Sequence, residues 1–188
     1  MSFQLIFLSL LFLCRPLHAQ SIAADQQIVK EPGAVIFRPP TGWRVADSQA
    51  LPPRTQVMVV GPKEGDFPPS INLSTEKFDG SLKDYLKIIK EINDSQQSEW
   101  KDLGKIRTKA GEASLSQTDA ATEWGVIRMM HAILLKNGVI HILTAAALKM
   151  DFPKHYKEFF ESLRSLQIHE DPDQMAEGNL PSSSDRKT

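Results

Sequence analysis

Cysteine is almost missing from this chain. Among its 188 residues only Cys14 carries a thiol, and it stands inside an apolar segment near the N-terminus. If that segment is removed, the remaining chain can form no disulfide, no cysteine-based zinc site and no thiolate nucleophile. Packing of apolar side chains, and not covalent cross-links, must then stabilise the fold.

An excess of charge of either sign is missing as well. Lys and Arg together number 22, and Asp and Glu together number 23, so the formal net charge is −1. A surface that binds nucleic acid needs clustered Lys and Arg to neutralise phosphates, so the composition argues against a nucleic-acid partner. The sequence shows no polybasic membrane patch either.

Long hydrophobic runs are also absent, since a membrane span needs about 20 apolar residues. The longest run, residues 5–14 (LIFLSLLFLC), has the length of the hydrophobic region of a signal peptide. Small residues behind it allow cleavage between Ala19 and Gln20, with a second candidate site after Ala23. We therefore predict a Sec-type signal peptide over residues 1–19. The mature protein is expected in the periplasm or outside the cell, without an integral membrane segment.

Two other interpretations of this segment remain open. Cys14 is a candidate lipidation site, although Leu13 stands where a lipobox has Gly, Ala or Ser. The segment is also a candidate for a buried N-terminal helix or an uncleaved anchor. The Pro and the polar residues behind it favour removal.

The rest of the chain divides into one folded domain with a polar segment on each side. Residues 20–33 are polar, and residues 169–188 have almost no bulky apolar side chains, so both are predicted to be flexible. Between them, residues 34–168 show apolar runs and period-two alternation that predict seven strands. The predicted strands cover 34–37, 56–60, 70–78, 100–108, 112–122, 126–136 and 139–148.

Two helices and one hairpin are marked most clearly. Ser81, with Asp84 three residues later, predicts a capped helix that ends near Asp94. A second helix is predicted over residues 153–166, with Tyr156, Phe159, Phe160 and Leu163 on its apolar face. Asn137-Gly138 predicts a two-residue β-hairpin turn. In that register His131 pairs with Thr144 and His141 with Leu134, on opposite faces of the sheet.

No catalytic, cofactor-binding or metal-binding set of residues emerges. The histidines lack metal-ligand spacing, and no Ser stands in a Gly-x-Ser-x-Gly turn. Trp43 is predicted to be a packing residue. Trp124, beside Gly125 at a predicted loop edge, is the candidate aromatic residue for binding a protein partner.

The segment Phe37-Arg38-Pro39-Pro40-Thr41-Gly42-Trp43 resembles the opening strand and turn of the PsbP/Mog superfamily. The aromatic closing helix, which ends here in Ser165-Leu166, and the long hairpin before it also resemble that superfamily. The resemblance covers about residues 34–168. It implies an α+β fold in which an antiparallel β-sheet is flanked by helices, and it implies a mainly non-enzymatic role.

These observations predict a secreted or periplasmic accessory protein that is not an enzyme and binds another protein. A chaperone or adaptor for a secreted effector is one alternative, which would require a cytoplasmic chain that keeps Met1. A small extracytoplasmic enzyme or ligand-binding protein, with a site assembled from distant residues, is the other.

Overall fold

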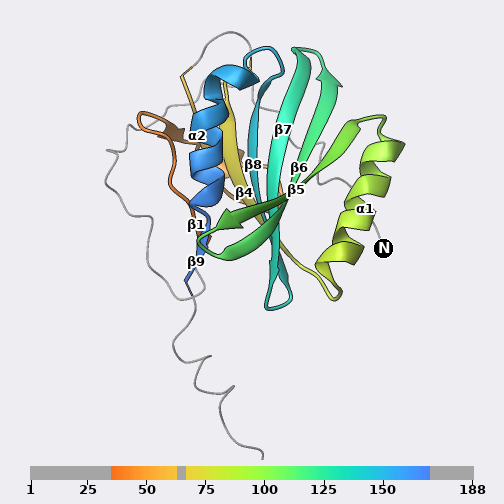
Figure 1. Ribbon diagram of the computed structural model, residues 1–188. Helices are drawn as coiled ribbons and strands as arrows, with labels where there is room; N and C mark the ends of the chain where they lie inside the picture. Colours follow the sequence, from red (N-terminus) through yellow and green to blue (C-terminus); the bar gives the residue numbers. More distant parts are fainter. Residues whose placement is uncertain (1–34, 63–66, 170–188) are drawn as a thin grey trace, which may run out of the picture.

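The computed structural model describes residues 35–62 and 67–169. The predicted signal peptide and its cleavage site, the segment 20–33 and residues 170–188 of the predicted tail lie outside these ranges. The prediction of an α+β fold is confirmed, because a seven-stranded antiparallel sheet is combined with two helices (Figure 1).

The strand order of the sheet is β2-β3-β4-β8-β7-β6-β5. Its strands are β2 (Arg44–Val45), β3 (Thr55–Val60), β4 (Ser70–Lys77), β5 (Glu99–Thr108), β6 (Gly111–Thr122), β7 (Gly125–Lys136) and β8 (Val139–Leu148). The short strands β1 (Val35–Ile36) and β9 (Gln167–Ile168) pair with each other near the C-terminal end of helix α2 (Figure 1). Strands β2 and β9 are only two residues long and were not predicted, because periodicity cannot be recognised in so short a segment.

The β7–β8 hairpin has the predicted turn and register. Asn137 and Gly138 both have positive φ, 50° and 70°, as a tight hairpin turn requires. Lys136 pairs with Val139, and the pairs His131–Thr144 and Leu134–His141 follow. The two histidines therefore lie on opposite faces of the sheet, as predicted.

Helix α1 (Leu82–Ser95) begins and ends where the sequence places it. The Ser81 hydroxyl accepts a hydrogen bond from the Asp84 backbone N–H, and the Asp84 carboxylate accepts one from the Ser81 backbone N–H. This reciprocal capping box satisfies two backbone donors that the first helical turn leaves unpaired.

Helix α2 (Phe152–Arg164) differs from the prediction at both ends and on one face. Tyr156 is 51% exposed and stacks on Phe160 at 4.5 Å between ring centroids, so its assignment to the buried face is wrong. Helical spacing gives the angular position of a side chain but not where the sheet beneath the helix ends. Asp151 precedes the helix, but its carboxylate pairs with Lys154 and caps no backbone N–H.

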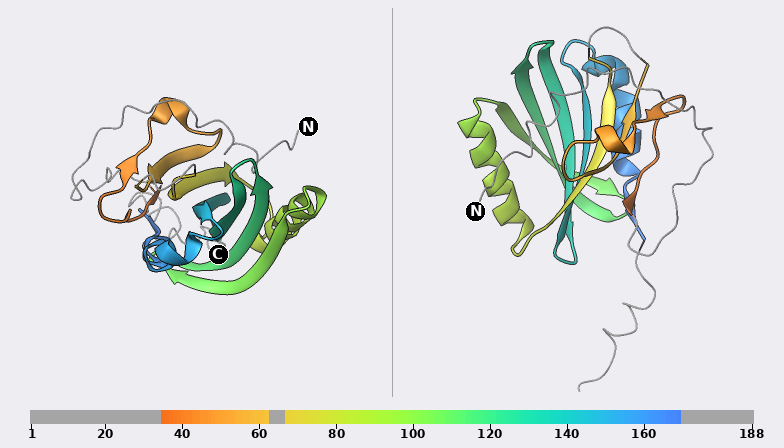
Figure 2. Two further views of the ribbon diagram at one scale, coloured as in Figure 1. Left: turned by 90° about the horizontal axis from the view of Figure 1, so that it is seen from above. Right: turned by 180° about the vertical axis from the view of Figure 1, so that it is seen from behind.

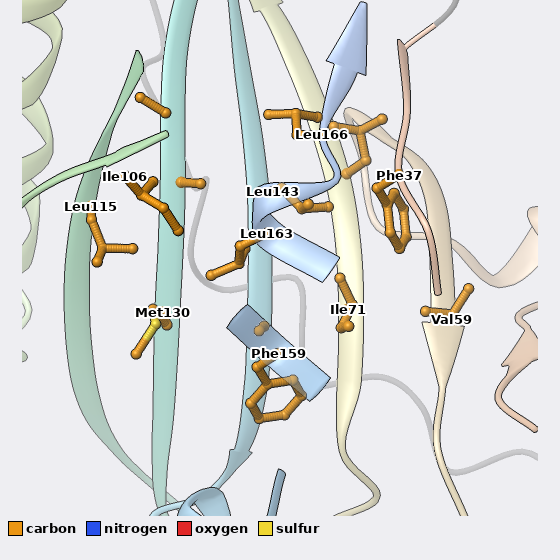
Figure 3. Close-up of a cluster of buried hydrophobic side chains, with 14 of the residues drawn as sticks. Phe37, Val59, Ile71, Ile106, Leu115, Met130, Leu143, Phe159, Leu163 and Leu166 are labelled. Carbon is orange, nitrogen blue, oxygen red and sulfur yellow. The ribbon is translucent and has the colours of Figure 1, made fainter. Parts of the chain in front are cut away.

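The two helices cover opposite faces of the sheet, as the view from above shows (Figure 2). Phe159 and Leu163 of α2 are fully buried against strands β4, β7 and β8 (Figure 3). Tyr85 and Ile89 of α1 pack on Ile133, Ile140 and Ile142 of the other face. The prediction that the hairpin is covered on both sides is therefore confirmed.

Candidate functional site

A row of polar side chains crosses the face of the sheet that α1 partly covers. Its members are neighbours in register on five adjacent strands, so their side chains point to the same face. We call this set the polar row: Asn72, Thr144, His131, Ser116 and Asp102. Asp102, on the edge strand β5, is exposed, whereas the other four are buried.

Apolar clusters flank the polar row on both sides. Two residues further along β7, Ile133 belongs to the cluster beneath α1. Two residues in the other direction, Met129 belongs to a second cluster, which Phe67 covers. The same face thus alternates from apolar to polar to apolar along the strands.

Several polar groups in and beside the polar row are buried and find no hydrogen-bond partner among the described residues. They are the hydroxyls of Ser70, Ser116 and Thr118 and the indole N–H of Trp100. Thr118 pairs with Trp100 across β5 and β6, and it lies two residues along β6 from Ser116 on the same face. An unsatisfied buried polar group costs about 1–3 kcal/mol, and such groups are uncommon in folded proteins.

His131 occupies the centre of the polar row. Its Nδ1 lies 3.0 Å from the Thr144 hydroxyl. Burial lowers the pKa of His131 to about 4, because the interior disfavours the imidazolium form. The imidazole is therefore neutral near pH 7, and the buried part of the row carries no formal charge.

Two hollows lie at the ends of the polar row. At one end, Met58, Asn72 and Ser74 contribute to a small hollow of about 50 Å³. At the other end, a groove of about 600 Å³ runs between α1 and strands β5 and β6. The larger hollow, which we call the α1–β5 groove, has the size of a site for a ligand or a peptide segment.

The α1–β5 groove combines apolar and charged walls. Leu82, Leu86, Trp100 and Ala113 supply its apolar side chains. Four lysines and two carboxylates also line it: Lys83, Lys87, Lys90, Lys105, Asp102 and Glu112. The formal charge of the lining is therefore positive by two.

Trp43 and Trp124 have different surroundings. Trp43 is 8% exposed and packs edge-on against Phe159, so the predicted packing role is confirmed. Trp124 is half-buried in the turn before β7, and its ring lies 5.8 Å from that of Phe67. It belongs to the second apolar cluster and does not line the α1–β5 groove. Its role as a binding residue stays a prediction.

Ser116 and Thr118 were not recognised as site residues from the sequence. The only available signal was the alternation of Ser114, Ser116 and Thr118 along a predicted strand, which indicates a shared face but not burial. Within the described ranges, no group of His, Cys, Asp and Glu side chains could hold a metal ion. Among those residues, no helix has the length and apolarity to cross a membrane.

No protein-family model matches the chain, and no curated protein matches it. Three solved structures are similar. LpqN of Mycobacterium tuberculosis, described as involved in cell envelope biogenesis, has a TM-score of 0.51 and 15% identity over 74% of this chain and 87% of its own. Cyanobacterial PsbP (CyanoP) of Synechocystis has a TM-score of 0.48 and 12% identity over 74% and 95%. A Pseudomonas aeruginosa protein of unknown function has a TM-score of 0.46 and 17% identity over 70% and 83%.

These similarities concern the fold. LpqN has the highest TM-score of the three, and its identity to this chain is still only 15%. The α+β fold that the resemblance to the PsbP/Mog superfamily implied is confirmed in the structure. A shared fold does not transfer a partner or an activity, so function must be argued from the site.

Proposed function

We propose that this chain is a non-enzymatic accessory protein that acts outside the cytoplasm and binds another protein through the sheet face that carries α1. The observation that carries the proposal is the α1–β5 groove of about 600 Å³, whose lining combines apolar side chains with four lysines. A polypeptide segment matches this lining, because it carries apolar and charged side chains together.

The proposed location is supported by the predicted signal peptide at residues 1–19. The similarity of fold to LpqN, a protein described as involved in cell envelope biogenesis, agrees with it. The chaperone alternative would use the same surface in the cytoplasm. N-terminal sequencing of the protein from fractionated cells separates the two, since export predicts a mature chain that begins at Gln20 or Ala24.

Site-specific photo-crosslinking in living cells tests the binding surface. A photoreactive amino acid replaces Lys87, which lines the α1–β5 groove, and in a control replaces Lys157, an exposed residue of α2 on the opposite face. We expect a defined adduct from position 87 and none from position 157. The partner, identified by mass spectrometry and purified, should then bind the unmodified protein in calorimetry. Equal adducts from both positions, or none from position 87, would refute the proposal.

A further inference from the structure

The chemistry of the segment that fits the α1–β5 groove can be inferred from its lining. This inference rests on the proposed function and names the partner's binding segment more closely. The apolar part of the groove comes from Leu82 and Leu86 of α1 and from the Trp100 side chain of β5. All three are partly buried in the α1 cluster, so their remaining surface offers an apolar strip to a ligand.

The charged part of the groove is a stripe of lysines. Lys83, Lys87 and Lys90 follow each other at spacings of four and three, which places them on one side of α1. Lys87 has Glu91 at 3.9 Å, whereas Lys83 and Lys90 form no ion pair within the described part of the chain. Two lysines of the rim are therefore available for carboxylates of a partner.

The acidic residues of the groove do not cancel this stripe. The Glu112 carboxylate lies 2.5 Å from the Lys105 ammonium group, so these two charges neutralise each other. The Asp102 carboxylate accepts a hydrogen bond from the Gly104 backbone N–H at 2.8 Å, inside the bulge of β5. The excess of positive charge in the lining therefore comes from the lysines of α1.

The lysine stripe separates a polypeptide from an acyl chain as the occupant. An acyl chain offers no charge to Lys83 and Lys90 along its length, whereas an acidic segment places carboxylates beside them. The groove is also concave, which does not suit the flat surface of a bilayer.

We infer that the α1–β5 groove binds an acidic, amphipathic polypeptide segment of a partner protein. The apolar side chains of that segment lie on Leu82, Leu86 and Trp100. Its carboxylates pair with Lys83 and Lys90.

Three probes test this assignment by fluorescence anisotropy and by binding to vesicles. The first is a labelled amphipathic peptide of about 15 residues, similar in length to α1, with Leu on one face and Glu on the other. The second is the same peptide with Lys in place of Glu, and the third is vesicles of phosphatidylglycerol. We expect the Glu peptide to bind, the Lys peptide not to bind, and the affinity to fall between about 0.05 M and about 0.5 M salt.

Two protein variants with equal charge change complete the test. K83E/K90E reverses the two lysines of the groove that lack an ion pair, and K109E/K157E reverses two exposed lysines elsewhere. We expect the first to weaken binding of the Glu peptide by more than about tenfold and the second to leave it within about twofold. Both variants should keep the wild-type Tm, because the replaced side chains are exposed.

Several outcomes would overturn the inference. They are equal binding of the Glu and Lys peptides, equal loss in both variants, and binding of vesicles without binding of the Glu peptide. If position 87 captures a partner in cells while the Glu peptide fails to bind, the proposed function stands and only the acidic segment is refuted. If no partner is captured but the Glu peptide binds selectively, the proposed function fails and the assigned chemistry of the groove stands.

Discussion

Acidification should destabilise this protein through His131. Burial lowers the pKa of the folded imidazole to about 4, whereas an unfolded histidine titrates near its ordinary value of about 6.5. Between these values the unfolded chain binds a proton that the folded chain does not. The free energy of unfolding therefore falls as the pH drops below about 6.5, and this loss is complete below about pH 4.

The size of the effect follows from the two pKa values. A difference of about 2.5 units corresponds to a total loss of about 3 kcal/mol, of which about 2 kcal/mol is lost by about pH 5. That is a large part of the free energy of unfolding of a typical domain, which is on the order of 10 kcal/mol. His141, on the opposite face, also has a pKa lowered by burial, so it adds a loss in the same direction.

Urea denaturation between about pH 7.5 and about pH 4.5 measures this loss, and H131Q is the matched variant. Glutamine does not titrate, yet its amide can still reach the Thr144 hydroxyl. We expect H131Q to have a flatter dependence of unfolding free energy on pH than wild type, by about 2.5 kcal/mol over this range. A lower stability of H131Q at pH 7 does not affect this comparison, because only the dependence on pH is compared. Identical slopes in the two proteins would refute the reasoning.

Three further predictions concern the stability of the fold and the binding of the Glu peptide. T118V should leave the unfolding free energy unchanged or raise it, because the Thr118 hydroxyl has no hydrogen-bond partner among the described residues. T144V removes the contact with the His131 imidazole and should lower the unfolding free energy by about 1 kcal/mol. Equal losses of unfolding free energy for the two variants in urea denaturation would contradict this reasoning. S81A should lower the unfolding free energy by about 1 kcal/mol through loss of the α1 cap, and an unchanged value would show that the cap contributes nothing. W100A should weaken binding of the Glu peptide, because the apolar strip of the groove loses its largest side chain; unchanged binding would show that the segment does not contact Trp100.

Much of the fold could be predicted because its signals are local. The capping box at Ser81, the Asn137-Gly138 turn and the alternation along 126–136 each depend on residues close in sequence. The register of the hairpin then placed His131 and His141 on opposite faces, and the structure agrees. The site could not be predicted in this way, because the polar row takes one residue from each of five strands that are up to 72 positions apart in the chain.

The sequence alone determined that this chain is nearly free of cysteine, balanced in charge and composed of β-strands and two amphipathic helices. Only the tertiary structure decided that β6 lies between β5 and β7, which brings Trp100 opposite Thr118 and Ser116 beside His131. Only the tertiary structure shows that the exposed lysines of α1 line a groove against β5 and β6. The physical reason is that side-chain periodicity specifies which face a residue shares, whereas pairing between distant strands specifies which residues meet on that face.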